Sequence, residues 1–266
     1  MKHLLISEIY RLKKNKGILV TAILALVFSI LLPLFMTLMI AIIESELSIG
    51  SLGFHGIHQF CSVLSGGSLI SFILFFTTTS YSCDDFKFGT IRNKIITGSS
   101  RKSIYLAKLI INVAVGVIIQ TVYALLSLLF CSIFLGYDGS GAFAFSDFLN
   151  ILSLLVSSIF IQITTYSLLT ALTANLQKSN KSVLFFVIAM MVVSVLFEVL
   201  YFIFQELDLY KVLVLINDLY PTNQINYIMF NELHPDLVIL IVVSNILYSL
   251  IISIIGLKSF EGKELK

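Results

Sequence analysis

Long apolar runs dominate the pattern of hydrophobic and polar positions along the chain. Each run is about twenty residues or longer, enough for a helix rising 1.5 Å per residue to cross a hydrocarbon core of about 30 Å. Strands of a membrane barrel would instead alternate apolar and polar residues over about ten positions. The pattern predicts an all-α, polytopic membrane protein with six transmembrane helices, at Ile18–Ile43, Phe60–Ser82, Ile104–Leu135, Phe148–Ala174, Val183–Gln205 and Leu237–Leu257.

Two shorter apolar segments accompany these spans. Leu5, Ile9 and Leu12 recur at helical spacing and predict an amphipathic elbow helix in the cytoplasmic interface before the first span. Residues 209–220 are also apolar, but the segment is about a dozen residues long and ends at Pro221, which favours a re-entrant or interfacial helix before the sixth span. No internal repeat or hydrophilic insertion divides the chain, so residues 1–266 are expected to form a single transmembrane domain.

Composition agrees with this pattern. The chain is 58% hydrophobic and 12% charged, with a mean hydropathy of +1.01, whereas soluble domains carry about 25% charged residues. A water-soluble fold is therefore excluded. The first apolar run is too long for a signal peptide and lacks a small-residue cleavage site, so it is expected to be retained as a membrane anchor.

The charges are strongly segregated along the chain. Sixteen of the 17 Lys and Arg residues lie before the first span, in the second and fourth loops, or at the end of the chain. Those at the end of the chain are Lys258, Lys263 and Lys266. Basic residues near helix ends stay in the cytoplasm, so both termini are predicted to be cytoplasmic in the cell membrane. The basic face also suits anionic membrane lipid, and nucleic acid is not needed as a partner. The opposite loops carry Glu44, Glu46, Asp138, Asp147, Glu206, Asp208, Asp218, Glu232 and Asp236.

The second cytoplasmic loop, residues 82–108, is the most structured polar stretch. Thr90 is expected to cap a short helix that Gly98 ends, and Ser99 or Ser100 to cap the next helix, near Arg101. The apolar side of the short helix is predicted to consist of Ile91, Ile95 and Ile96. From the residues alone, this loop could serve only to set topology, or it could dock a partner.

The same loop resembles the one between the second and third transmembrane helices of type-2 ABC exporter permeases. The resemblance rests on an acidic residue, then Gly-Thr-hydrophobic-basic-Asn, then Gly-x-Ser-Arg, although the family often has Glu where this chain has Asp. In that family the loop holds a coupling helix that docks into a groove on a separate ATPase. The resemblance implies a coupling segment formed by Asp84, Asp85, Gly89, Thr90, Ile91, Arg92, Asn93, Gly98, Ser100 and Arg101.

The resemblance also implies partners. The permease would pair with an identical or homologous permease and with two ATPase subunits, which use ATP and Mg²⁺. This chain has no G-x-x-x-x-G-K-[ST] motif, so it is expected to bind no cofactor and to be no enzyme. Small members of the family often export peptide antibiotics or give immunity to them, which implies an amphipathic or peptide-like substrate such as an antimicrobial peptide, a toxin or a lipid-like molecule.

Two other functions fit the sequence. A membrane immunity protein could sequester a peptide without transport, for which the acidic outer loops would suffice. An ion-coupled secondary transporter usually has internal repeats and several buried ionisable groups, and only Glu198 is placed inside a span here. A carboxylate there is costly unless it faces protein or water, so Glu198 is either a contact for a cationic substrate or a hydrogen-bonded packing residue.

Other polar residues within the spans have two interpretations. Gln162 and Tyr166 lie in the fourth span, and Asn112 and Gln120 in the third, where they could line a substrate path or simply join neighbouring helices. Gly66 and Gly67 in the second span are expected to permit close helix approach.

No metal site is expected. His55 and His58 are spaced for one helical turn, but no further ligand stands near them in sequence. Cys61, Cys83 and Cys131 are odd in number and widely spaced, so they suggest neither a disulfide framework nor a metal site.

Overall fold

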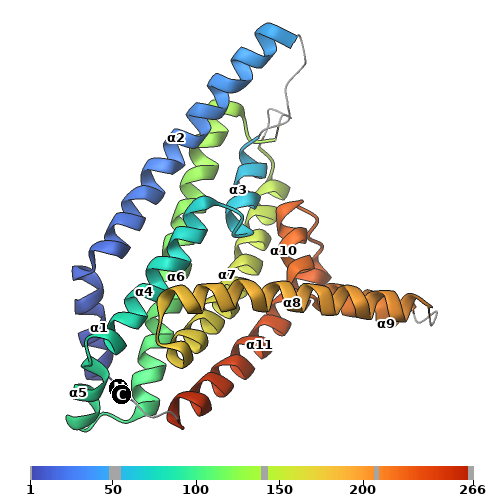
Figure 1. Ribbon diagram of the computed structural model, residues 1–266. Helices are drawn as coiled ribbons and strands as arrows, with labels where there is room; N and C mark the ends of the chain where they lie inside the picture. The colour runs from blue at the N-terminus through green and yellow to red at the C-terminus, as the bar shows by residue number, and fades with distance from the viewer. Residues whose placement is uncertain (1, 48–54, 139–142, 207–209, 263–266) are drawn as a thin grey trace.

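The computed structural model describes residues 2–47, 55–138, 143–206 and 210–262, and within these ranges every regular element is an α-helix (Figure 1). Asp208, Lys263 and Lys266, which the charge pattern assigns to loops or the chain end, lie outside the described residues. The described part contains six segments long and apolar enough to span a membrane. The predictions of an all-α fold and of a multi-pass membrane protein are therefore confirmed.

The six spans begin and end within a few residues of the predicted limits. Each extends into polar residues at one or both ends, because backbone hydrogen bonding continues into the interfacial region. The spans are α2 (Lys16–Leu47), the pair α3 (Gly56–Leu64) and α4 (Leu69–Lys87), α6 (Arg101–Leu135), α7 (Phe145–Leu176), α8 (Ser179–Glu206) and α11 (Pro235–Glu261).

The second span differs from its prediction because it is two helices rather than one. Gly66 has a φ of +80°, a left-handed conformation that ends the first helix. The Ser68 hydroxyl then accepts a hydrogen bond from the Ser71 backbone N–H at 3.2 Å and caps α4. The interpretation of Gly66 as a residue for close helix approach was wrong, since the structure uses it for this break.

The largest apolar core surrounds α3. Phe60 of α3, Tyr123 of α6, Leu154 of α7 and Ile241 of α11 are all buried in it. Close approach by a glycine does occur elsewhere, where Gly116 of α6 lies against the ring of Tyr166 and leaves no room for a side chain. These contacts hold α6, α7 and α11 as a central group.

Short helices complete the chain. They are α1 (Lys2–Lys14), α5 (Thr90–Ile96), α9 (Tyr210–Leu219) and α10 (Pro221–Met229). The apolar segment before the sixth span thus forms a short helix as predicted, and Pro221 begins the next one, where its missing N–H is not needed.

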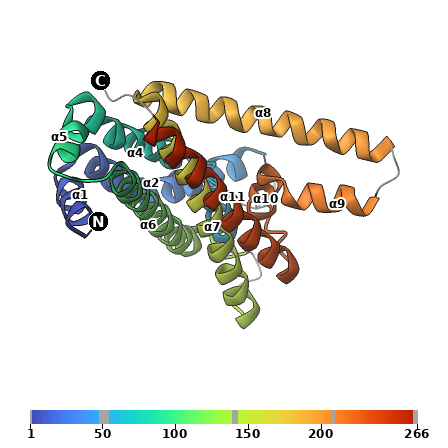
Figure 2. The same cartoon turned by 90° about the horizontal axis from the view of Figure 1, so that it is seen from below.

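One part of the molecule projects from the helix bundle. Figure 2 shows α1, α5 and one end of α6 gathered at one side, whereas α8 begins near α4 and α7 and extends away from them toward α9. Only 11% of the residues in the most apolar stretch of α8 are buried within the chain. Several charged side chains, among them Glu8, Asp85 and Lys108, are buried where α1, α4, α5 and α6 meet.

Candidate functional site

The short helix α5 is set by local sequence at both ends. Gly89, with a φ of +65°, occupies the position before the helix. At its other end Gly98 has a φ of +89°, and the Ser99 N–H donates to the Lys94 carbonyl at 3.0 Å. Ser100 then caps α6 by accepting from the Ser103 N–H at 3.3 Å. The predicted order of helix, break and new helix is confirmed.

Thr90 does not cap α5, contrary to the prediction. Gly89 takes the capping position, and the Thr90 hydroxyl donates instead to Asp85 Oδ1 at 2.5 Å. The reason is that Asp85, at the end of α4, is turned inward and needs donors there. Asp85 is only 2% exposed.

Asp85 and Glu8 are the two acids of a buried ionic cluster. Asp85 Oδ2 lies 3.0 Å from Lys94 Nζ and 2.6 Å from Lys108 Nζ. Glu8 Oε1 lies 2.5 Å from the same Lys94 Nζ. Arg11 joins both acids, with its Nη2 3.0 Å from Glu8 Oε2 and its Nη1 paired with Asp85.

Tyr81 and a backbone carbonyl add further contacts to this ionic cluster, although the buried Nε of Arg11 has no hydrogen-bond partner among the described residues. The Tyr81 hydroxyl donates to Glu8 Oε2 at 2.8 Å, and the guanidinium of Arg11 lies 4.2 Å from the centre of the Tyr81 ring. Lys108 Nζ also donates to the Ser82 carbonyl at 3.1 Å. The ionic cluster therefore ties together four helices: α1 through Glu8 and Arg11, α4 through Tyr81 and Asp85, α5 through Thr90 and Lys94, and α6 through Lys108.

The charges within this cluster stabilise one another. Burial acts to raise the pKa of Glu8, but the neighbouring cations Lys108, Arg11 and Lys94 outweigh burial and lower that pKa. A buried charge is tolerated only when paired and hydrogen-bonded, and each acid here has several partners. The arrangement makes α5 a fixed extension of three other helices rather than a loosely attached loop.

The opposite face of α5 is free of this cluster. Ile91 is 2% exposed, whereas Ile96 is 74% exposed, so the predicted apolar side does not hold for Ile96. Arg92 and Asn93 are exposed as well. Together with exposed Phe88, they form an outward face of one cation, one amide and two apolar side chains, Phe88, Arg92, Asn93 and Ile96, which is called the α5 face below.

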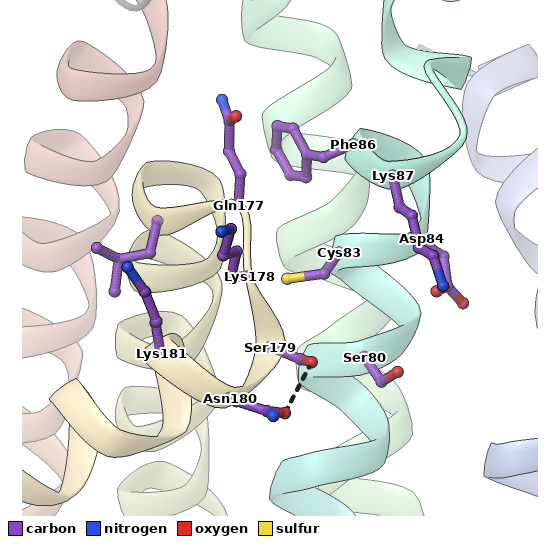
Figure 3. Close-up of a pocket in the computed structure, with 11 residues that line it drawn as sticks. Ser80, Cys83, Asp84, Phe86, Lys87, Gln177, Lys178, Ser179, Asn180 and Lys181 are labelled. Carbon is purple, nitrogen blue, oxygen red and sulfur yellow. Dashed lines mark hydrogen bonds between the residues drawn. The ribbon is translucent and has the colours of Figure 1, made fainter.

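A cavity of about 690 Å³ lies on the other side of α4, between its end and the connection from α7 to α8 (Figure 3). Lys87, Lys178 and Lys181 line it, together with Asp84 and Cys83. At its wall the Ser179 hydroxyl donates a hydrogen bond to Asn180 Oδ1 at 3.4 Å. Asp84 is thus among the residues that line this cavity, while its neighbour Asp85 belongs to the ionic cluster.

Apart from Asp84, which lines the cavity, and Arg101, the predicted coupling residues fall into three groups. Asp85, Thr90 and Ile91 are turned inward, and Arg92 and Asn93 outward. Gly89, Gly98 and Ser100 shape the backbone between them. Arg101 donates from Nη1 to the Glu261 carbonyl at 2.8 Å and thus ties the start of α6 to the end of α11.

The residues predicted as a tentative substrate path do not form one site. Asn112 donates to the hydroxyls of Ser82 and Thr170, at 2.6 and 3.0 Å, and Tyr166 is buried beside Gly116, so both join helices. Gln120, Gln162 and Tyr166 line a common cavity. Glu198 lies apart from them, exposed on α8, in a cavity of about 220 Å³.

Sequence reasoning missed most of the ionic cluster. Arg11, Lys94 and Lys108 were counted only as basic residues that set orientation, and neither Glu8 nor Tyr81 was considered. A signal was present, since Lys108 stands inside an apolar run, where a charge needs a partner. Which acids would supply that partner depends on the packing of α1 against α6.

The histidines lie in a different part of the fold. The rings of His55 and His58 have centroids 6.2 Å apart, and His55 Nδ1 lies 3.4 Å from the Leu135 carbonyl oxygen. Among the described residues no group of three or more His, Cys, Asp or Glu side chains could hold a metal ion. Cys61, Cys83 and Cys131 are buried free thiols.

In comparisons with known proteins, the chain matches no protein-family model and no curated protein.

Proposed function

We propose that this chain is the permease subunit of an ABC exporter, driven by a separate ATPase that docks on the α5 face. The proposed cargo is an amphipathic or peptide-like molecule that leaves the cytoplasm or the membrane. The proposed assembly holds two permease chains, identical or homologous, and two ATPase subunits that use ATP and Mg²⁺. In this proposal the chain is not itself an enzyme.

The observation that carries the proposal is the combination of an anchored inner side of α5 with an exposed outer face. Exposed apolar side chains next to an arginine are typical of protein interfaces, because they lose water when a partner covers them. Phe88, Arg92 and Ile96 provide this chemistry on the described part of the chain. The sequence resemblance of the same loop to a coupling helix agrees with that use.

The ionic cluster supplies the second requirement, which is transmission of movement. A displacement of α5 would be transmitted to α4 through the Lys94–Asp85 contact and from there to α6 through Lys108. It would be transmitted to α1 through the contact between Lys94 and Glu8. Charge-assisted hydrogen bonds are short and directional, so these helices are expected to move with α5 as one unit. A loop held only by flexible surface side chains would move by itself and leave the membrane-spanning helices in place.

The decisive experiment compares Arg92→Glu with Lys178→Glu in the organism that encodes the chain. The chain is affinity-purified from membranes at matched expression, copurifying ATPase is quantified, and protection against or export of peptide is measured. Arg92→Glu should release the ATPase and abolish transport, because a like-charge contact in a desolvated interface costs several kcal/mol. Lys178→Glu is an equal change of charge at an exposed lysine of the α7–α8 connection. This variant should still copurify the ATPase and still transport peptide.

Two results would contradict the proposal. The first is an Arg92→Glu chain that still copurifies the ATPase and transports normally. The second is equal failure of both variants, which would show that general basic charge matters rather than the α5 face. Protection that survives deletion of the ATPase would point to sequestration of the peptide without transport.

A further inference from the structure

A branched cavity lies among the membrane-spanning helices, away from the ionic cluster. One branch, of about 190 Å³, is formed where the junction of α3 and α4 meets α6, α7, α8 and α10. The other, of about 270 Å³, lies between α7, α8, α10 and α11. The two branches adjoin each other and share wall residues, which are Ile161, Thr165, Phe186, Met190 and Ile225.

The first branch contains buried amide groups that need partners. Gln162 is 7% exposed, and within the described structure neither its Nε2 nor its Oε1 has a hydrogen-bond partner. Gln120 donates from Nε2 to the Val63 carbonyl and the Ser71 hydroxyl, at 2.5 and 2.6 Å, but its Oε1 likewise has no partner. Inside a hydrocarbon environment an unpaired amide is unfavourable, so these atoms are suited to a ligand that pairs with them.

The chemistry of the walls defines what that ligand is. The unpaired atoms comprise one amide donor group and two carbonyl acceptors, so the complementary group must both donate and accept. The described residues that line the two branches include no charged side chain. The second branch is lined largely by aliphatic and aromatic residues such as Leu168, Val193 and Phe197. An ionised ligand would enter without a counter-charge, whereas an uncharged amide with an apolar tail would satisfy both branches.

We infer that this branched cavity binds an uncharged amide that carries an apolar chain, with the amide at Gln162 and Gln120 and the chain between α7, α8 and α11. A peptide unit with apolar side chains and a fatty amide share this chemistry. Binding needs no ATPase, and only the further claim that the ligand is cargo rests on the proposed function. A binding test on the chain alone can therefore fail or succeed independently of the docking test at Arg92.

The test uses the full chain in phosphatidylcholine nanodiscs and three photoreactive probes. One is a long-chain primary amide bearing a diazirine, the second is the carboxylate of the same chain, and the third is an N-acetylated hydrophobic dipeptide amide bearing a diazirine. The primary amide should label α7 and α8 peptides saturably, and at least about tenfold more strongly than the carboxylate, given the cost of burying an unpaired charge. The dipeptide probe distinguishes a peptide ligand from a fatty amide.

Two variants and a control locate the site. Gln162→Leu should reduce amide labelling at least about tenfold without lowering the melting temperature, because it removes unpaired polar atoms rather than a hydrogen bond. Met190→Trp should block labelling from the shared wall while Gln162 remains. Gln59→Leu, the same kind of change on α3 at a residue that lines neither branch, should label like the wild type.

Labelling that survives both Gln162→Leu and Met190→Trp would show that the probe does not bind in this cavity. The unpaired atoms of Gln162 would then be hydrogen-bonded to buried water. Equal labelling by the carboxylate and the primary amide would overturn the inferred ligand class. Labelling by either amide probe that both variants abolish would support the inference and identify which source of amide the cavity prefers.

Discussion

Lys108 Nζ of α6 lies 2.6 Å from Asp85 Oδ2 of α4, and both side chains are almost completely buried. The pair joins α4 and α6 near the two ends of the segment that contains α5. Because neither charge has access to bulk water, each depends on the other and on Lys94, Glu8 and Arg11. The consequences of disturbing this contact can be measured.

Removal of Lys108 should destabilise the fold strongly. Lys108→Ala removes the cation that lies 2.6 Å from the buried carboxylate of Asp85, and loss of one partner of a buried pair costs about 3–5 kcal/mol. The matched control is Lys102→Ala, because Lys102 is an exposed lysine on the same helix that pairs loosely with Glu261, at 3.8 Å. Exposed pairs contribute about 0–1 kcal/mol.

The measurement for this pair of variants is the free energy of unfolding in detergent by denaturant titration. A loss for Lys108→Ala no larger than that for Lys102→Ala would show that the buried ionic cluster does not contribute to stability.

Acid should weaken the same ionic cluster through Glu8. The folded chain lowers the pKa of Glu8 below its ordinary value of 4.5, so at mildly acidic pH the unfolded chain binds a proton more readily than the folded one. The stabilisation due to Glu8 is therefore complete above the ordinary pKa and is lost as the pH falls through the lowered one. Glu8→Gln should reduce stability at pH 7, and its difference from the wild type should shrink as the pH falls below 4.5.

Thermal unfolding across this pH range, with Glu232→Gln as an exposed control, checks this expectation. A constant difference between Glu8→Gln and the wild type at every pH would mean that folding does not lower the pKa of Glu8.

The topology predicts which loops an impermeant thiol reagent can reach in intact cells. Glu232 is exposed between α10 and α11, and Asn180 is exposed at the start of α8. Glu232→Cys should react from outside, whereas Asn180→Cys should react only after the cells are permeabilised, because the lysines near Asn180 mark the cytoplasmic side. The three native cysteines are buried and give a low background. Labelling in the reverse order would invert the assigned orientation.

Glu198 offers a test of cargo charge. It is exposed on α8 and lines its cavity together with Tyr201 and Asn217. If the cavity contacts a cationic peptide, Glu198→Gln should lower transport about tenfold, equivalent to about 1.4 kcal/mol, while the ATPase still copurifies. Asp236→Asn is the control for a change of acidic charge elsewhere. Unchanged transport by Glu198→Gln would show that the charge of Glu198 does not act on the cargo.

Local sequence by itself determined the membrane-spanning architecture and the backbone breaks between α4, α5 and α6. In a bilayer each helix must satisfy its own backbone and must be long enough to cross, so apolar length alone predicts the spans. The conformations of Gly98 and Ser100 are likewise decided within a few residues, and their roles at the end of α5 and the start of α6 were predictable.

Only the tertiary structure decided which polar residues meet. Glu8 and Lys108 are one hundred positions apart in sequence, and nothing in either segment indicates the other. Their cluster forms because α1 packs against α6 and because α4 turns Asp85 inward. The same holds for Gln120 and Gln162, which lie on different helices and become neighbours in one cavity only after α6 and α7 pack together. Pairing of buried polar groups is non-local, and for that reason hydrophobic length and helix caps could not reveal it.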